Sequence, residues 1–213
     1  MKLYYHPLST YSQKVLIALY EKGIDFTPEI VNLMDPEAHN RYRETYPMGK
    51  IPCLELDDGH IIPESSIIIE YLESLAEPTL LKGDVDERRR IRFKDRMYDL
   101  YLNEAVATLL FQGLKPEGEQ DPERIEKARS NIATMYGFME NEFGNQSYSN
   151  GEEFMMSDCA AAPALFYALQ VAPFAEHKNI CAYWERLKSR PSIQRTQEDA
   201  TPYLEAFMNK NAA

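Results

Sequence analysis

A cluster of hydroxyl side chains lies near the N-terminus, where a short aromatic segment gives way to a helical pattern. Ser9 and Ser12 have the spacing of a redox Cys-x-x-Cys pair with oxygen in place of both sulfurs. Such a pair cannot form a disulfide, but its hydroxyls can donate hydrogen bonds to a thiolate from another molecule. A helix N-terminus adds unpaired N–H groups and partial positive charge, which favour an anion. The alternative is that these hydroxyls only cap the helix, a role for which Ser and Thr are preferred.

Two other short motifs contain residues suited to binding. Pro52 stands directly before a predicted strand, and Glu64 and Ser65 stand at the start of a predicted helix. An Ile–Pro bond is trans by default, and ordinary capping is the alternative for Glu64 and Ser65. Each motif alone is therefore a weak signal for a site.

The composition argues against several functions. A net charge of −11 disfavours a nucleic-acid or anionic-membrane surface. No apolar run is long enough to span a bilayer, and the N-terminal residues lead directly into a strand without a signal-peptide pattern. Cys53, Cys159 and Cys181 are widely spaced, which fits a reducing cytoplasm, and the four histidines are scattered, so we expect no metal site.

The first part of the chain alternates strand and helix patterns. The predicted elements are a strand at 3–5, a helix at 13–22, an edge strand at 26–31 containing Pro28, a helix from Pro36, a hairpin and a helix ending near Leu75. Asp58 and Gly59 predict a type I′ turn in that hairpin. This order predicts an α/β domain with helices on a small mixed sheet.

The second part contains no convincing strand. After a linker at 77–84 we expect one long helix at 86–111, a second at 123–143, an apolar helix at 159–171, and two shorter helices at 180–189 and 193–208. The long helix is apolar around much of its circumference, which predicts cover on more than one side and suggests a two-fold dimer. The chain therefore divides into an α/β domain at 1–78 and an all-helical domain at 86–213.

Together these motifs resemble the cytosolic glutathione S-transferase superfamily, in its bacterial, serine-type form with a theta-, zeta- or omega-like active turn. The strongest matches lie at residues 9–15, 48–54, 58–67 and 157–165, and the resemblance covers nearly the whole chain. It implies a thioredoxin-like N-terminal domain followed by an all-helical C-terminal domain. It also implies a cytoplasmic, homodimeric detoxification enzyme that conjugates the glutathione thiolate to an apolar electrophile, without a metal.

The resemblance assigns the chemistry to the hydroxyl cluster. Ser9 matches the catalytic Ser or Cys of the theta-, zeta- and omega-like classes, and we expect it to stabilise the thiolate. Thr10 matches the cysteine of the beta class and is the rival. Tyr5 and Tyr11 are lesser rivals, because the tyrosine classes place their catalytic residue close to the first strand.

The same resemblance implies how glutathione, the co-substrate, is held. Pro52 would be a cis proline that lets the Ile51 backbone pair with the cysteinyl part. Glu64 would meet the γ-glutamyl ammonium, and Ser65 with helix N–H groups would meet its carboxylate. Lys50, and less strongly His39, would meet the glycyl carboxylate.

The electrophile pocket of the family lies between the two domains. The residues we expect to line it are Tyr11, Tyr98, Tyr101, Leu102 and Phe111, although aromatic residues at helical spacing are more often part of the core.

The sequence departs from the family pattern at three points. The active turn lacks a cysteine, which argues against thioltransferase chemistry, and the zeta-class signature is not met. Met155 stands where a Ser or Thr normally caps the helix that contains Asp158, so half of the capping box is lost.

The alternatives to glutathione transfer are a non-catalytic interaction protein with this fold, or a glutathione-dependent dehalogenase, etherase or peroxidase.

Overall fold

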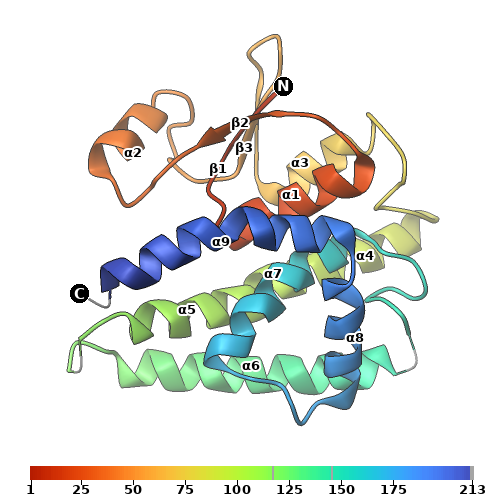
Figure 1. Cartoon of the computed structure of the whole chain (residues 1–213). Helices are drawn as coiled ribbons and strands as arrows, with labels where there is room; N and C mark the ends of the chain where they lie inside the picture. Colours follow the sequence, from red (N-terminus) through yellow and green to blue (C-terminus); the bar gives the residue numbers. More distant parts are fainter. Residues whose placement is uncertain (117, 145, 212–213) are drawn as a thin grey trace. The chain divides into compact units, whose positions relative to one another are not determined.

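A computed structural model describes residues 1–116, 118–144 and 146–211 of the chain (Figure 1). By their contacts the residues form two units: Met1–Leu80 with the segment that begins at Pro191, and Leu81–Arg190. The sequence predicts this C-terminal segment as part of the second domain, 86–213. Residues 212 and 213 lie outside the residues that the structure describes. In the structure the segment packs on the first unit, because its helix lies against the first helix of the chain.

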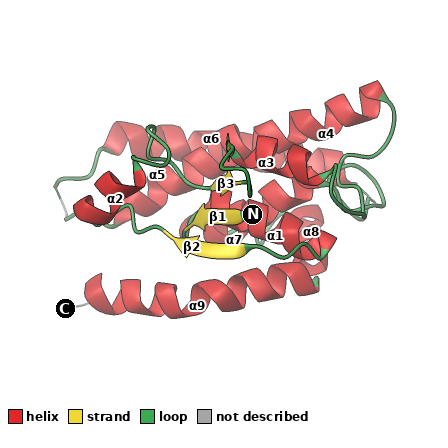
Figure 2. Cartoon of the chain, turned by 90° about the horizontal axis from the view of Figure 1, so that it is seen from above, coloured by secondary structure: helices red, strands yellow, loops and turns green. Residues whose placement is uncertain are grey.

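The first unit is built on a four-stranded sheet in the order β2-β1-β3-β4. β1 (Lys2–Tyr5) pairs in parallel with β2 (Thr27–Ile30) and antiparallel with β3 (Cys53–Glu55), which pairs antiparallel with β4 (Ile61–Pro63). β2 is an edge strand, as predicted, which tolerates the missing N–H of Pro28. Figure 2 shows the edge position of β2.

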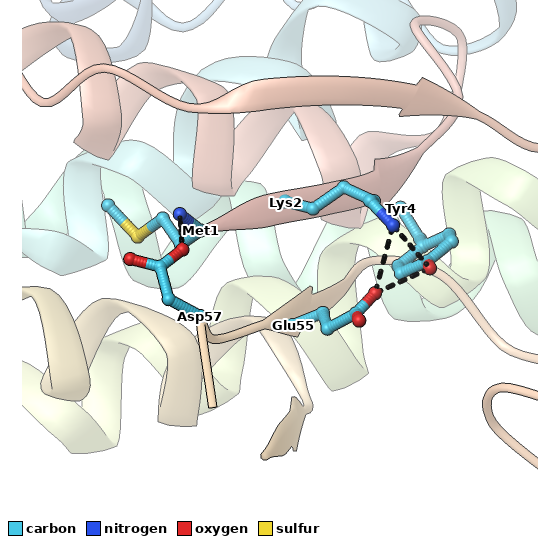
Figure 3. Close-up of polar contacts among 5 residues, drawn as sticks. All are labelled: Met1, Lys2, Tyr4, Glu55 and Asp57. Carbon is cyan, nitrogen blue, oxygen red and sulfur yellow. Dashed lines mark hydrogen bonds and ion pairs between the residues drawn. The ribbon is translucent and has the colours of Figure 1, made fainter. Parts of the chain in front are cut away.

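Polar contacts at the start of β1 reinforce its pairing with β3 (Figure 3). The hydroxyl of Tyr4 donates to the Glu55 carboxylate at 2.6 Å, and Lys2 Nζ lies 3.2 Å from the same carboxylate oxygen. The N-terminal ammonium of Met1 lies 2.7 Å from Asp57. These contacts favour one register between the two strands.

The helices of the first unit are α1 (Thr10–Lys22), α2 (Pro36–Tyr42), α3 (Ser65–Leu72) and α9 (Pro191–Asn211). α1 packs against α3 and α9, and the fully buried side chains of Leu3, Leu16, Leu54 and Ile68 form part of the core. α1 begins at Thr10, before the predicted start at 13, and α3 ends before Leu75. α9 is longer than predicted.

The hairpin between β3 and β4 is present, but its turn differs from the type I′ prediction. Among the described non-glycine residues only Glu64 has a positive φ, so Asp58 lacks the conformation that a type I′ turn requires. The N–H of Gly59 donates to the Leu56 carbonyl at 2.9 Å, and Gly59 has φ 82°. This is the geometry of a three-residue loop that ends in a left-handed glycine.

The second unit is helical, as predicted, and the strand pairing in its described part is one isolated bridge between Tyr148 and Gly151. Its helices are α4 (Val85–Met97), α5 (Glu104–Gly113), α6 (Pro122–Phe143), α7 (Met156–Val171) and α8 (Lys178–Lys188). The predicted single long helix at 86–111 is interrupted by a π-helical segment, η1 (Tyr98–Asn103), between α4 and α5. In the described part of the chain, no helix combines the length and apolar character needed to cross a bilayer.

The start of α7 keeps half of its capping box. Asp158 accepts hydrogen bonds from the N–H of Met155 at 2.7 Å, the N–H of Ser149 at 2.9 Å and the hydroxyl of Tyr183 at 2.5 Å. Burial raises the pKa of Asp158 to about 6, and the three hydrogen bonds act in the opposite direction. The N–H of Asp158 donates to the Met155 carbonyl at 2.9 Å, and Met155 makes no side-chain cap hydrogen bond.

Candidate active site

The strand register brings three separate segments to the same end of the strands, and this end of the sheet is the edge meant below. Tyr4 pairs with Cys53, and Cys53 pairs with Pro63. Pro52, which precedes β3, and Glu64, which follows β4, therefore lie at the edge where β1 ends. The N-termini of α1 and α3 both start from this edge. The structure thus brings together the three motifs that the sequence singled out.

Ser9 is the N-cap of α1. Its backbone is extended, with φ −75° and ψ 121°, and its Oγ accepts a hydrogen bond from the N–H of Ser12 at 3.3 Å. Of these hydroxyl residues, Ser9 is therefore the one that caps α1. A hydroxyl can accept and donate at once. In the described part of the chain, the Ser9 hydroxyl accepts a hydrogen bond but donates none. Ser9 can therefore cap the helix and still donate a hydrogen bond to a ligand.

Ser12, Thr10 and Tyr11 have different environments. Ser12 is fully buried, and its Oγ accepts from the N–H of His6 at 3.3 Å, so Ser12 supports the turn from inside. Thr10 is the first residue of α1 and is half-buried, as is Tyr11. Of the two serines in the turn, Ser9 is therefore the one that a ligand can approach, and Thr10 and Tyr11 remain partly accessible.

Two residues that sequence reasoning missed hold the turn before Ser9. His6 Nδ1 accepts from the N–H of Leu8 at 3.2 Å, and burial lowers the pKa of His6. The side-chain amide of Gln13 donates to the Pro7 carbonyl at 2.7 Å. A His followed by Pro at the end of a strand is a signal for such a turn, but the partner atoms depend on the folded backbone.

The loop before β3 is held by α2. His39 Nε2 lies 3.0 Å from the Gly49 carbonyl oxygen, and the hydroxyl of Tyr42 donates to the Lys50 carbonyl at 2.8 Å. Gly49 has φ 63°, and a Cβ there would lie 2.5 Å from His39 Nε2, so this position requires glycine. The Ile51–Pro52 bond is cis, as the resemblance implied. Because its Nε2 already contacts Gly49, His39 supports the loop directly.

The start of α3 has a strained backbone. Glu64 has φ 69° and ψ 119°, is exposed, and makes no side-chain hydrogen bond to the helix that it precedes. Ser65 is buried at the first helical position. Below it, the buried Lys14 of α1 donates to Ser66 Oγ at 2.8 Å, which ties the two helices together at this edge.

The remaining predicted site residues differ in their burial. Tyr5 is buried, its pKa is raised by burial, and it lines a separate hollow beside α9. In the second unit Leu102 is fully buried, and Tyr98 is buried with its hydroxyl 2.9 Å from Ser149 Oγ, which fits a core role for both. Tyr101 and Phe111 are more than half exposed.

The site has no metal-binding arrangement in the described ranges. No three His, Cys, Asp or Glu side chains come together there in a way that could hold an ion. Lys50 is exposed, and Ile51 is half-buried beside the buried Pro52. The groups at this edge therefore include hydroxyls, helix N–H groups, the exposed Glu64 carboxylate and the exposed Lys50 ammonium. These groups can bind a flexible molecule that carries both charges.

Comparisons with known proteins identify the family of the chain. A model of the glutathione S-transferase N-terminal domain matches residues 3–80, and one of the C-terminal domain matches residues 101–191. Glutathione S-transferase 3 of Zea mays is 30% identical over 208 residues, which cover 92% of each chain. Glutathione S-transferase GstA of Escherichia coli O157:H7 is 29% identical and covers 91% of this chain and 96% of its own.

A solved structure extends the likeness to three dimensions. The glutathione S-transferase from Methylobacillus flagellatus, crystallised with glutathione bound, is 28% identical and superposes with a TM-score of 0.83, covering 92% of this chain and 98% of its own. Sequence, family models and fold agree over both units. The chain belongs to the cytosolic glutathione S-transferase superfamily.

Proposed function

We propose that this family member is a serine-type glutathione transferase in which Ser9 stabilises the thiolate of bound glutathione. The observation that carries the proposal is the convergence of Ser9, Pro52 and Glu64 at one edge of the sheet. The thiolate attacks an electrophilic carbon of an apolar second substrate. A carbon–sulfur bond forms, and the leaving group departs with its electron pair.

The physical basis is a lower thiol pKa. A free thiol titrates near ~8.5, so only a small fraction is thiolate at neutral pH. The Ser9 hydroxyl donates to the sulfur while its Oγ keeps the N–H of Ser12. The N-terminus of α1 adds partial positive charge. Both effects favour the thiolate over the thiol.

The remaining groups hold the two charged ends of glutathione. Ser65 and the first N–H groups of α3 suit the γ-glutamyl carboxylate, and the Glu64 carboxylate suits the ammonium. The Ile51 backbone pairs with the cysteinyl part, and Lys50 meets the glycyl carboxylate. His39 then acts on this end through Gly49 rather than by contact.

Burial reduces the number of residues that can contact the electrophilic second substrate. Tyr11, Tyr101 and Phe111 remain candidates for contact with the second substrate, because each is at least partly accessible. Tyr98 and Leu102 are buried, so we assign them to the core of the second unit. The exposed Phe93 and Leu100 leave an apolar strip on the α4 and η1 surface, which we propose is covered in a homodimer. The enzyme acts in the cytoplasm, where glutathione stays reduced.

Calorimetric titration with glutathione, followed by conjugation of an activated aryl halide, tests the proposal. We expect the wild type to bind glutathione and to form the conjugate. Ser9→Ala should keep binding and lose most turnover, whereas Thr10→Ala should change turnover little. A failure of the wild type to bind glutathione would favour a non-catalytic interaction protein. Turnover lost in Thr10→Ala but kept in Ser9→Ala would transfer the role to Thr10.

A panel of second substrates separates the remaining enzymatic alternatives. A dehalogenase, etherase or peroxidase would use the same bound thiolate on a different electrophile. Ser9→Ala should therefore depress each of these reactions by a similar factor. Comparing the rates with an alkyl halide, an aryl ether and an organic hydroperoxide shows which reaction the wild type favours.

A further inference from the structure

A second hollow lies in the first unit, between the edge strand β2, the end of α1 and α9. Its volume is about 500 Å³, within the usual range for small-molecule pockets. Neither Ser9, Pro52, Glu64 nor Ser65 lines it. Figure 2 shows α9 running alongside β2 in this region. The hollow is therefore distinct from the proposed glutathione site.

The walls of this hollow are rich in aromatic rings. Phe26 packs edge-on against Tyr5, with ring centroids 6.3 Å apart, and Tyr203 packs edge-on against His6 at 5.5 Å. Phe26 and Tyr203 are both only partly buried. Such rings can pack against a planar apolar ligand and favour an aromatic one.

The charged groups in the hollow are paired in an unusual way. Arg195 and Asp199 stand four residues apart on α9, a spacing at which an ion pair can form. Instead, Asp199 accepts a hydrogen bond from the hydroxyl of Tyr20 at 2.6 Å. The Arg195 guanidinium stacks on the Tyr20 ring, with Cζ 4.0 Å from the ring centroid. Burial and Asp199 raise the pKa of Tyr20 well above its usual value, so its hydroxyl remains a donor.

This arrangement leaves the guanidinium ready for an anion. The Arg195 guanidinium lies over the Tyr20 ring and is exposed, and a guanidinium carries its N–H donors in a planar fork. Within the described part of the chain, these N–H groups have no recorded hydrogen bond or ion pair. A planar guanidinium fork matches a carboxylate in a bidentate geometry.

We propose that this hollow binds a small aromatic carboxylate, with its ring on Phe26 and Tyr203 and its carboxylate on Arg195. Two carboxylates oppose the ligand charge: Asp199, which is bonded to Tyr20, and Asp25, which is exposed at the rim. The site therefore depends on the geometry of the guanidinium fork, because the net charge of its lining does not favour an anion.

Calorimetric titration with 2-naphthoate in saturating glutathione tests this site. The matched probes are the neutral 2-naphthalenemethanol and the cationic 2-naphthylmethylammonium. We expect naphthoate to bind most tightly. Arg195→Gln should weaken naphthoate by about tenfold or more, because it removes a charge-assisted hydrogen bond. Arg195→Lys, which keeps the charge but loses the fork, should fall between the two.

Two further variants test the pairing on which the proposal depends. Asp199→Asn keeps an oxygen acceptor for the Tyr20 hydroxyl and removes the opposing charge, so naphthoate should bind more tightly. Tyr20→Phe frees Asp199 to pair with Arg195, so naphthoate should bind more weakly although the ring remains. Conjugation activity should not change in Arg195→Gln, and thermal unfolding of each variant confirms that it is folded.

Three results would overturn the proposal. One is naphthoate affinity that does not change in Arg195→Gln, which would place the ligand elsewhere. Another is tighter binding of the cationic probe than of naphthoate. The third is weaker naphthoate binding in Asp199→Asn, which would show that Asp199 attracts the ligand.

Discussion

The N-termini of α1 and α3 start from the same sheet edge, but they are built in opposite ways. Ser9 has an ordinary extended backbone and caps α1 through a hydrogen bond to the N–H of Ser12. Glu64 stands in the same position before α3, has a positive φ of 69°, and does not cap its helix. The residue that we propose for catalysis also stabilises the fold, whereas the residue that we propose for binding strains it.

This difference has a thermodynamic meaning. A hydroxyl can cap a helix and still donate its hydrogen, so the function of Ser9 costs little stability. A positive φ for a residue with a side chain costs about 1 to 3 kcal/mol and persists only when the surroundings impose it. The two helix starts should therefore respond to substitution with opposite changes in stability and similar losses of function.

The largest effect is expected for Ser9→Ala. Loss of a hydrogen bond to a charged sulfur should lower kcat/KM at neutral pH by about tenfold to a hundredfold. Loss of the cap should also lower the free energy of unfolding by about 1 kcal/mol. Steady-state kinetics and urea unfolding measure the two quantities. Thr10→Val is the matched control, and equal losses in both variants would contradict the assignment to Ser9.

Glu64→Gly should separate stability from binding. Relief of the positive φ should raise the free energy of unfolding by about 1 kcal/mol, after the entropic cost of glycine. Loss of the carboxylate should weaken glutathione by about tenfold. Glu64→Gln, which keeps the backbone strain, should weaken glutathione without a gain in stability. If Glu64→Gly were less stable than the wild type, the strain argument would be wrong.

The starts of α1, α2 and α3 show what the sequence could predict. The start of α2 was placed correctly, because Asp35 followed by Pro36 is a local signal. The start of α1 was placed too late, because Ser9, Thr10 and Ser12 can all cap and only the backbone selects one. The positive φ of Glu64 has no local signal, since contacts from the rest of the fold impose it.

Three further features could not be predicted from the sequence for a similar reason. The residues of η1 continue the apolar pattern of a long helix, so a change in backbone hydrogen bonding there was invisible in the sequence. Asp58 and Gly59 fit a two-residue turn, but β3 ends at Glu55 and β4 begins at Ile61, which leaves a longer connection. The burial of Tyr98 and Leu102 likewise depends on packing against neighbouring helices.

A pH change should alter the stability of the turn that precedes Ser9. His6 Nδ1 accepts from the N–H of Leu8 only when neutral, and burial lowers the pKa of His6. The unfolded chain takes up this proton near about pH 6.5, before the folded chain does, so stability should fall as the pH drops below that value. His6→Asn keeps an acceptor that does not titrate. Urea unfolding across this pH range should show a shallower dependence in the variant, and identical slopes would exclude this role of His6.

The smallest effect is expected at α2, which serves as a reference for an ordinary cap. Asp35 accepts from the N–H of Glu37 at 2.9 Å and that of Ala38 at 3.3 Å. Asp35→Ala should lower the free energy of unfolding by about 1 kcal/mol. Glutathione affinity should stay within about twofold, since α2 contacts the loop before β3 through His39 and Tyr42. A larger loss of affinity would show that glutathione binding depends on the start of α2.

The most direct test of the account is the pH titration of thiolate absorbance for bound glutathione. In the wild type the midpoint should lie clearly below the free-thiol value of ~8.5. In Ser9→Ala it should rise by about 1 to 2 units, the equivalent of one hydrogen bond to a charged group. Equal midpoints in the two proteins would contradict the central claim that Ser9 stabilises the thiolate.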